Sequence, residues 1–183
     1  RDLVLIGGGH AHALVLKRWG MRPLPGARLT VINPDPTAPY TGMLPGHVAG
    51  HYPRAALDID LVRLCRFAGA RLILGHASAI DPGERRISIA GRGDVAYDIA
   101  SVDVGIASDP PDVDGFAEHG IAAKPLGRFA DAWKGFLSSD VAAEVVVIGA
   151  GVGGVELALA MHHALTERGR MPRITLVDRG AAL

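Results

Sequence analysis

Residues 145–154 read VVVIGAGVGG, and residues 3–12 read LVLIGGGHAH. Each stretch is an apolar run that ends in a glycine-rich turn, and a helical pattern follows each turn. An apolar strand, a glycine turn and a helix open a βαβ unit, so the same local structure is expected twice. The two stretches predict an α/β fold with parallel strands.

Glycine turns at the start of a helix suit the binding of phosphate. The first N–H groups of a helix have no partner within it, and the helix dipole places positive charge there. Glycines make the tight turn, let the backbone approach a pyrophosphate and let the helix pack on its strand. Two dinucleotide sites are therefore expected, each of the Rossmann type.

The second glycine turn is followed by a further feature of a dinucleotide site. Residues 173–178 predict a second strand that ends in Asp178, 24 residues past Gly154, near the spacing of roughly 20 residues expected for a ribose-binding acid. A carboxylate at this point can accept hydrogen bonds from ribose hydroxyls. The alternative is a βαβ turn without a ligand, because a chain with 24 glycines matches a short glycine pattern by chance.

The first glycine turn departs from the pattern at two positions. His12 stands where the third glycine is expected, and the following strand, residues 28–33, ends in Asn33 instead of an acid. An amide can still form a hydrogen bond with ribose, but it carries no charge. A dinucleotide site is still predicted here.

Composition indicates a globular protein with small-molecule partners. Of the 183 residues 49% are hydrophobic, and 19 basic residues balance 19 acidic ones, with no basic cluster to bind nucleic acid. No apolar stretch approaches the roughly 20 residues of a membrane-spanning helix. No signal peptide is seen, so a cytoplasmic or membrane-peripheral location is expected.

The cysteine count bears on redox chemistry. Cys65 is the only cysteine, so this chain holds neither a disulfide nor a Cys-x-x-Cys pair, and disulfide reductase chemistry is disfavoured. It lies in a helical pattern over residues 58–68 and is expected to be a small core residue. Asp58 and Asp60 are interpreted as helix cap and helix-start charges.

The segments between the two units predict the connections. Residues 33–39 are rich in proline and are expected to be a loop, neither strand interior nor helix. Residues 40–51 predict a short irregular helix against a flat ligand, with an exposed loop as the alternative. Short extended segments then form an antiparallel meander that replaces a crossover helix and leads to a buried strand; they are residues 76–80, 85–90 and 94–97, and the strand is 99–104.

The second domain is expected to begin after a proline-rich boundary at residues 108–112. The predicted domains are residues 1–110 and residues 111–183. A helix over 126–138 should present one apolar face, formed by Leu126, Phe129, Ala130, Trp133 and Leu137. Only two of the at least three parallel strands of a Rossmann half are present, so the chain is expected to be the N-terminal half of a longer enzyme.

These features together resemble the two-dinucleotide-binding-domain flavoproteins of the pyridine nucleotide-disulfide oxidoreductase-like superfamily. In that superfamily one Rossmann domain holds FAD and a second holds NAD(P)H. Residues 6–12, 39–46 and 49–52 look most like the NADH dehydrogenase-type FAD domain found fused to selenide, water dikinase. Type II NADH dehydrogenases and sulfide:quinone reductases are broader relatives. The resemblance covers essentially all 183 residues.

The resemblance implies an FAD-dependent oxidoreductase that passes a hydride from NAD(P)H to flavin and then to an unidentified acceptor. The acceptor would be a small molecule such as a quinone, and selenide, water dikinase would be a fused or separate partner. The half-chain alone is expected to be inactive and to bind flavin weakly. Asp178 favours NADH because a carboxylate repels a 2′-phosphate, although the adjacent Arg179 leaves NADPH open.

The resemblance also implies the site residues. Those at the FAD pyrophosphate are Gly7, Gly9, His10 and His12, and Asn33 lies near the adenosine ribose. Ala77 would offer its backbone to adenine, Gly105 would match a family glycine, and Tyr40, Thr41, Met43 and Pro45 would approach the flavin ring. Gly149, Gly151, Gly154 and Asp178 would hold the nicotinamide cofactor, with Glu156 on the nicotinamide side as the candidate catalytic residue.

Two alternatives remain open. One is a non-catalytic nucleotide-binding or sensing module that kept the Rossmann scaffold; His12, Asn33 and Asp103 favour it because each weakens a cofactor contact, whereas the intact second motif argues against it. The other is a metal site at His47 and His51, which are spaced i, i+4. No third ligand has a recognisable spacing, so no metal is expected.

Overall fold

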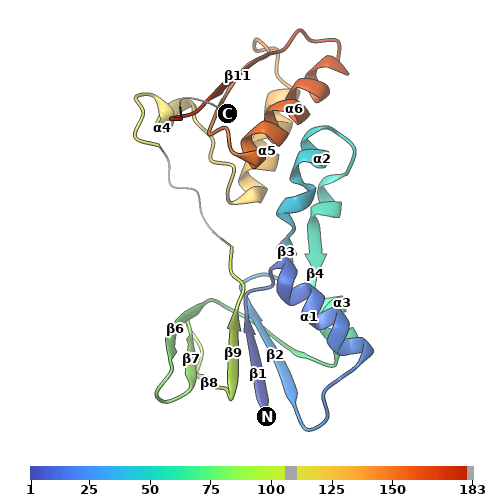
Figure 1. Cartoon of the computed structure of the whole chain (residues 1–183), viewed down its shortest axis with the longest axis vertical. Helices are drawn as coiled ribbons and strands as arrows, with labels where there is room; N and C mark the ends of the chain where they lie inside the picture. The colour runs from blue at the N-terminus through green and yellow to red at the C-terminus, as the bar shows by residue number, and fades with distance from the viewer. Residues whose placement is uncertain (106–110, 181–183) are drawn as a thin grey trace. The chain divides into compact units, whose positions relative to one another are not determined.

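The computed structural model describes residues 1–105 and 111–180. The chain forms two compact units, and Figure 1 shows the elements of each. In the described residues the first unit comprises 1–40 and 58–105, and the second comprises 41–57 and 111–180. The predicted domains, 1–110 and 111–183, differ from these units in residues 41–57, and most of the expected boundary at 108–112 lies outside the described residues.

The first unit is built on a four-stranded parallel sheet with the strand order β5-β2-β1-β9. The strands are β1 (Asp2–Ile6), β2 (Arg28–Asn33), β5 (Arg71–Leu74) and β9 (Ile99–Val102). The glycine turn follows β1 and leads into α1 (His10–Met21), which returns the chain to β2. The predicted βαβ unit is confirmed.

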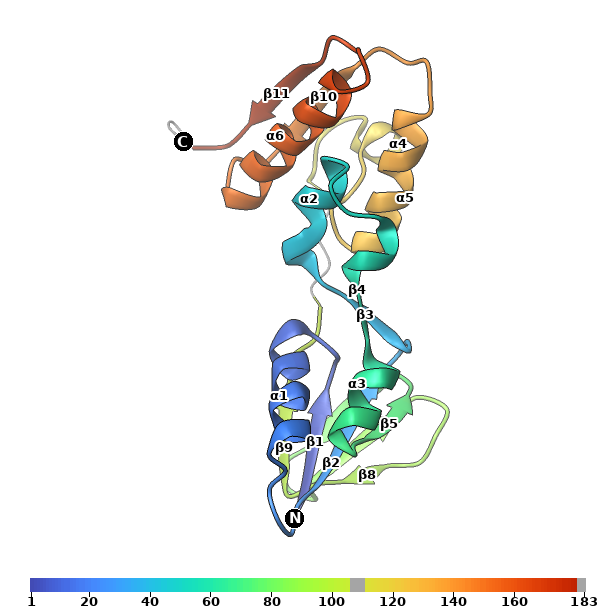
Figure 2. The ribbon, with the colours of Figure 1, turned by 90° about the vertical axis from the view of Figure 1, so that its right-hand side faces the viewer.

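Alternation along the strands builds a three-layer structure. One face of the sheet, with Leu5 and Val31, packs on α1 and on α3 (Leu61–Ala68), as Figure 2 shows. The other face, with Val4, Ile6 and Ile32, packs on a three-stranded antiparallel meander. The meander consists of β6 (Ala77–Asp81), β7 (Arg86–Ile89) and β8 (Val95–Ala96). Successive side chains of a strand point to opposite faces, so the same four strands supply apolar side chains to the helices on one face and to the meander on the other.

The meander crossover is thus confirmed, but the strand that follows it is not buried. β9 ends at Val102, and Ile99 and Val102 are 51% and 56% exposed. Within the described residues β9 pairs with β1 alone, so it is an edge strand. A continuous apolar run is typical of a strand buried on both faces, and β9 is not buried in that way. The prediction of a buried strand over 99–104 was wrong in this respect.

Two local predictions also need correction. Thr37–Pro39 forms a short strand, β3, which pairs antiparallel with β4 (Asp58–Asp60). A proline is tolerated there because β3 is an edge strand, with β4 as its one neighbour among the residues described, and a strand edge needs few N–H donors. The helix predicted over 58–68 therefore begins only at Leu61, and Asp60 caps it by accepting a 2.9 Å hydrogen bond from the Arg63 N–H. The cap is confirmed for Asp60 and wrong for Asp58, which lies in β4.

The second unit contains the second glycine turn between β10 (Glu144–Ile148) and α6 (Val152–Thr166). β10 pairs in parallel with β11 (Arg173–Val177), as predicted. The short helix α2 (Leu44–Val48) packs on both α6 and α5 (Leu126–Leu137), and the three helices share one core that includes the buried Trp133 and Leu165. The helix predicted over 126–138 and its apolar face are confirmed, and a 3.1 Å hydrogen bond from the Trp133 indole to the Val48 carbonyl ties α5 to α2.

Residues 40–51 form the expected irregular helix, a 3₁₀ turn at Thr41–Met43 followed by α2. A further short helix, α4 (Phe116–His119), precedes α5.

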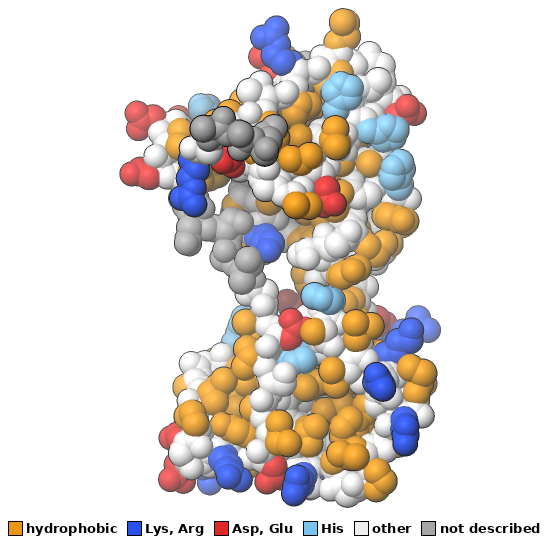
Figure 3. Space-filling view, in the orientation of Figure 1, with side chains coloured by type: hydrophobic (Ala, Val, Ile, Leu, Met, Phe, Trp, Pro, Cys, Tyr) orange, Lys and Arg blue, Asp and Glu red, His pale blue; other side chains and the backbone are white. Residues whose placement is uncertain are grey.

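The face seen in Figure 3 carries side chains of both charge signs among hydrophobic ones. Among the residues described, no helix has the length and apolar character needed to cross a membrane.

Candidate functional site

The second glycine turn is held in place by backbone and side-chain contacts. Gly149 has φ +104° and donates a 2.7 Å hydrogen bond to the Val177 carbonyl, which anchors the turn to β11. The next residue, Ala150, donates a 2.7 Å hydrogen bond to Asp178 Oδ2. The other oxygen of Asp178 accepts a 2.8 Å bond from the Gly180 N–H. Asp178 thus lies beside the turn, as its position after β11 predicts.

The turn is open at the start of α6. A Cβ built on Gly149, Gly151 or Gly153 would meet no atom within 4 Å. Among the described residues no side chain is seen to accept a hydrogen bond from the first N–H groups of α6, and β10 has one described neighbour, β11. Gly154 is different, because a Cβ there would collide with the carbonyl of Gly149. Gly154 is therefore required for close packing of the helix on the turn, whereas Gly149 and Gly151 leave room for a phosphate.

The charge of Asp178 is favoured by its neighbours. The hydrogen bond from the Ala150 N–H lowers the pKa of Asp178, and the bond from Gly180 and the nearby Arg179 act in the same direction. The side chain is exposed. A carboxylate that is ionised at neutral pH and exposed beside a glycine turn can accept hydrogen bonds from ribose hydroxyls and repel a second phosphate.

The first glycine turn repeats these anchors. Gly7 has φ +88° and donates a 2.8 Å hydrogen bond to the Ile32 carbonyl. Gly8 donates a 2.9 Å bond to Asn33 Oδ1, and the amide nitrogen of Asn33 donates a 2.7 Å bond to the Asp35 carbonyl. Asn33 therefore takes the same place at the first turn that Asp178 takes at the second, without the charge. It is buried, with 7% of its surface exposed.

His12, which replaces the third glycine, is part of the interior and is 3% exposed. Its Nδ1 lies 2.7 Å from the carbonyl of Gly7, and its Nε2 lies 2.9 Å from Ser101 Oγ in β9. A carbonyl only accepts, so Nδ1 carries the proton and donates it. The imidazole thereby joins α1, the glycine turn and β9. It does not face the outside of the turn, and only its backbone can lie near a pyrophosphate.

The first turn is also filled where the second is open. A Cβ on Gly9 would collide with the carboxylate of Asp103, and a Cβ on Gly8 would collide with the Leu61 side chain. Asp103 Oδ2 accepts a 3.0 Å hydrogen bond from the His12 N–H, and the Asp103 carbonyl accepts a 3.3 Å bond from the Gly9 N–H. The start of α1 therefore already carries an anionic side chain of this chain.

The remaining predicted site residues are distributed over both units. His10 is exposed at the start of α1, with its ring centroid 5.9 Å from that of Tyr40. Ala77 begins β6, and Gly105 follows β9 with open space around it. Thr41, Met43 and Pro45 belong to the second unit, in the 3₁₀ turn and α2. Glu156 is exposed on α6.

The whole of this chain, residues 1–183, matches the family model for pyridine nucleotide-disulphide oxidoreductases. The chain belongs to the pyridine nucleotide-disulphide oxidoreductase family. The resemblance at the level of the superfamily is thus confirmed, and so is the Rossmann-type α/β fold.

The comparisons identify several proteins similar to this pyridine nucleotide-disulphide oxidoreductase chain. NADH dehydrogenase-like protein YutJ of Bacillus subtilis (strain 168) is 25% identical over 191 residues, which cover 98% of this chain and 49% of YutJ. The sulfide:quinone oxidoreductase of Aquifex aeolicus has a TM-score of 0.77 at 21% identity, over 97% of this chain and 43% of that chain. The water-forming NADH oxidase from Lactobacillus brevis, bound to NADH, has a TM-score of 0.71 at 21% identity, over 97% and 39%.

The two structural similarities show a shared fold. The chain spans about half the length of the curated relative that it matches.

Despite the family's name, this pyridine nucleotide-disulphide oxidoreductase chain contains a single cysteine. Cys65 lies in α3, is 2% exposed and packs among Leu5, Leu16 and Val31. Burial raises the pKa of the Cys65 thiol to about 11. A neutral, inaccessible thiol is a poor nucleophile, so the prediction of a core residue is confirmed.

The histidines of the second unit do not form a cluster with acids or cysteine. His47 Nδ1 lies 2.9 Å from the Tyr52 carbonyl, and the ring of His51 packs on His163 with centroids 5.3 Å apart. Within residues 1–105 and 111–180, no group of three or more His, Cys, Asp or Glu side chains could hold a metal ion.

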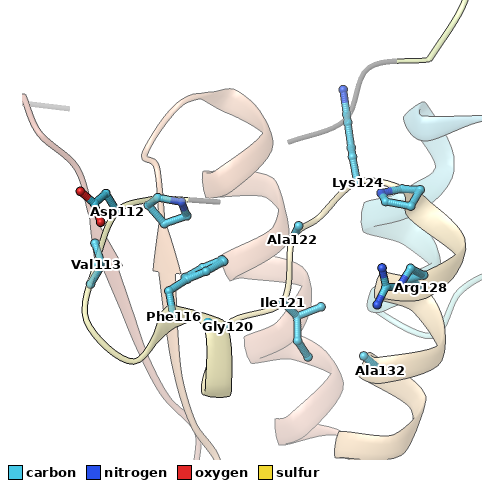
Figure 4. Close-up of a pocket in the computed structure, with 12 residues that line it drawn as sticks. Asp112, Val113, Phe116, Gly120, Ile121, Ala122, Lys124, Arg128 and Ala132 are labelled. Carbon is cyan, nitrogen blue, oxygen red and sulfur yellow. The ribbon is translucent and has the colours of Figure 1, made fainter. Parts of the chain in front are cut away.

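A cavity of about 780 Å³ was not anticipated from the sequence. Figure 4 shows Phe116 and Ile121 on one side of it and Arg128 and Ala132 of α5 on the other. Its lining combines two cations, Lys124 and Arg128, with one carboxylate, Asp112, among apolar side chains. It shares no residue with either glycine turn, so it is not assigned to a dinucleotide.

The cap that Asp103 provides for α1 was not anticipated from the sequence either. From the residue type alone, Asp103 is expected only to weaken a cofactor contact. Its place directly after β9, the strand parallel and adjacent to β1, is what could have indicated the cap, because the carboxyl ends of adjacent parallel strands meet at one edge of a sheet.

Proposed function

We propose that the protein is an FAD-dependent NAD(P)H oxidoreductase in which the second glycine turn binds the nicotinamide cofactor and the first binds FAD. The observation that carries the proposal is the presence of two strand, glycine turn and helix units in one chain of this family. In each, a side chain at the end of the second strand accepts a hydrogen bond from the turn, namely Asn33 and Asp178.

We propose that the second turn binds a dinucleotide without a change in its backbone. Gly149 and Gly151 leave open space before the uncapped start of α6, and Gly154 lets the helix lie close to the turn. The backbone N–H groups there would bind the pyrophosphate. Asp178 would accept hydrogen bonds from the ribose hydroxyls, which favours NADH, while Arg179 offers a cation to a 2′-phosphate.

Glu156 is the proposed residue on the nicotinamide side. It lies on α6 just past the first turn of the helix and is exposed, so it is free to approach a bound ring. Its proposed task is to orient the nicotinamide, because the hydride transfer itself belongs to the cofactors.

The first turn is proposed for FAD on the basis of its motif and of the family. Gly7, Gly9, His10 and the backbone of His12 would surround the pyrophosphate, and Asn33 would lie near the ribose. When bound, the flavin would supply hydride acceptance and electron transfer onward. The first turn fits this group only after a change, because Asp103 occupies the space beside Gly9.

Further residues complete the proposed flavin site. Ala77 would contact adenine, and Gly105 would approach the flavin from the end of β9. Tyr40, Thr41, Met43 and Pro45 are proposed to lie near the flavin ring.

The electron acceptor is proposed to be a small molecule of the quinone type. The proposal is supported by the similarity to a protein named NADH dehydrogenase-like and to a sulfide:quinone oxidoreductase. The resemblance of residues 6–12, 39–46 and 49–52 to the FAD domain fused to selenide, water dikinase adds that kinase as a proposed fused or separate partner.

The visible spectrum of the natural full-length protein tests the proposal. We expect flavin absorption bands in the purified protein and their bleaching by NADH without air. A colourless protein whose fluorescence does not respond to added FAD would contradict the flavin assignment. Flavin that is present but not reduced by NADH or NADPH would contradict the assignment of the second turn.

A second candidate is a nucleotide-binding module without turnover. The observation that favours it is the filled first turn, where the Asp103 carboxylate lies in the space beside Gly9. Such a protein would bind NAD(H) at the second turn and remain colourless. The same spectrum, combined with a titration of NADH, separates the two candidates.

A further inference from the structure

The carboxylate of Asp103 lies at the N-terminal end of α1. Its Oδ2 accepts a 3.0 Å hydrogen bond from the backbone N–H of His12, in the first turn of the helix. Its side chain fills the space into which a Cβ on Gly9 would extend. Its own carbonyl accepts the Gly9 N–H at 3.3 Å. One residue therefore satisfies two of the donors that a glycine turn offers to a phosphate.

The second glycine turn serves as an internal comparison. Gly151 takes the place of Gly9, and Gly154 takes the place of His12. A Cβ on Gly151 would meet no atom within 4 Å, and no side chain of the described residues caps α6. The two turns share their anchors to the neighbouring strand. They differ at the helix start because only the first has, in the described residues, a strand on the other side of its own, namely β9 beside β1, and Asp103 follows that strand.

A carboxylate and a phosphate bind the same backbone N–H donors at a helix N-terminus. Both are anions that accept N–H donors and are stabilised by the positive end of the helix dipole. They cannot both occupy the start of α1, because they would compete for the same donors and repel each other. Asp103 follows the last residue of β9, is half-buried itself and lies between the exposed Val102 and Val104, so a change of its rotamer requires neither of these neighbours to leave the core.

We propose that Asp103 is an internal competitor for the pyrophosphate at the first glycine turn, so that a dinucleotide binds there only when the Asp103 side chain leaves the start of α1. This inference rests on the proposed assignment of the first turn to FAD. It makes flavin occupancy adjustable through one side chain.

The test measures binding to the full-length protein stripped of flavin, in a Gly151→Val background that blocks the second turn. FAD and inorganic pyrophosphate are titrated separately by calorimetry into the parent, Asp103→Ala and Asp103→Asn. We expect Asp103→Ala to tighten both ligands by about tenfold or more, because a competing charge-assisted hydrogen bond is lost. Asp103→Asn should also bind both ligands more tightly, because its side chain no longer carries the charge that repels a phosphate, although it can still accept the His12 N–H.

Asp98→Asn is the matched control. Asp98 precedes β9 at its other end, and its Oδ2 accepts a 2.6 Å hydrogen bond from the Asp2 N–H. It is thus an aspartate that caps a backbone donor beside the same strand but away from the glycine turn. Its replacement should leave both affinities unchanged. A second measurement is the free energy of unfolding of the ligand-free protein, which should fall in Asp103→Ala because the cap of α1 is lost.

The outcomes separate this inference from the proposed function. If Asp103→Ala gains affinity for pyrophosphate while no variant binds FAD, the internal competitor stands and the flavin assignment fails. If the parent binds FAD and Asp103→Ala binds neither ligand more tightly while remaining folded, the inference is overturned and the flavin assignment stands. A gain of the same size in Asp98→Asn also overturns it, because the effect would then be a general one of charge.

Discussion

The carboxylate of Asp178 accepts a 2.7 Å hydrogen bond from the backbone N–H of Ala150. The end of the second strand is thereby joined to the glycine turn that follows the first. Asn33 and Gly8 make the same contact at 2.9 Å in the other unit. This side chain has two roles: it holds the turn in shape, and it is proposed to contact the ribose. Substitutions at Asp178 must keep the first role if they are to report on the second.

Asp178→Asn is the variant that meets this requirement. Its amide oxygen can still accept the Ala150 N–H, while the charge that repels a 2′-phosphate is removed. We expect the preference for NADH over NADPH to fall by roughly one to two orders of magnitude, since charge-assisted contacts contribute about 1.5 to 3 kcal/mol. Comparing kcat/KM for the two cofactors in the full-length enzyme measures the change.

Two further variants complete that experiment. Asp178→Ser should shift the preference by a similar factor and also loosen the turn. Glu144→Gln is the control, because Glu144 is an exposed acid at the opposite end of β10 and should leave the preference unchanged. An unaltered preference in Asp178→Asn would show that the carboxylate does not face the added phosphate.

Gly151 and Gly154 should respond differently to substitution. Gly151 has φ −64° and open space around it, so Gly151→Val is compatible with the fold but places a side chain in the path of a pyrophosphate. We expect native thermal stability, bound flavin and loss of flavin reduction by NAD(P)H. Stopped-flow absorbance together with a thermal melt measures all three. Reduction at the parent rate would show that the wrong turn has been assigned.

Gly154→Ala is the counterpart of Gly151→Val. Its Cβ would collide with the Gly149 carbonyl, so α6 must shift away from the turn. We expect a loss of stability of about 1 to 3 kcal/mol, as for other overpacked positions, along with weaker binding of NADH. If Gly154→Ala melts at the parent temperature, the close contact between helix and turn is not a constraint.

His12 should contribute mainly to the stability of the first unit. Replacing it by alanine removes a buried ring and leaves the Gly7 carbonyl without its side-chain donor. We expect a loss of about 2 to 4 kcal/mol in the free energy of unfolding. Ser101→Ala should cost about 1 kcal/mol or less, because it removes only one partner of His12. Hydrogen exchange of the β1 and α1 amides reports both effects.

The double variant of His12 and Ser101 provides the check on that contact. If the Nε2 to Oγ hydrogen bond stabilises the fold, the combined loss should be smaller than the sum of the single losses. Strict additivity would mean that the two side chains contribute independently.

Cys65 should make the protein less stable in alkaline solution. Burial raises the pKa of its thiol from 9.0 to about 11, so the unfolded chain loses this proton at a lower pH than the folded protein. The resulting stabilisation is complete below pH 9 and is lost as pH rises towards 11. Unfolding between these values should show a decline of about 2 kcal/mol that Cys65→Ala lacks. In the folded parent, thiol reagents should react slowly at neutral pH, and rapid labelling would contradict the buried position.

Local sequence was sufficient to predict the elements around each glycine turn. The apolar runs before Gly7 and Gly149 are four residues long, too short for a helix, and each ends at a glycine turn, so strands are predicted there. The same local reasoning predicted the meander, the α5 face with Trp133, and the burial of Cys65. These features depend on residues near one another along the chain, so periodicity and turn chemistry were enough.

Which side chains meet at the turns was decided by the tertiary structure. Asp103 lies far along the chain from His12, and they come together because β9 is placed beside β1 in the sheet. The same strand order leaves β9 with one described neighbour, so its apolar residues are exposed although their pattern indicated burial. Contacts between distant segments depend on how strands are ordered and paired. Local sequence carries little information about that order, and it is this order that places Asp103 at the first glycine turn.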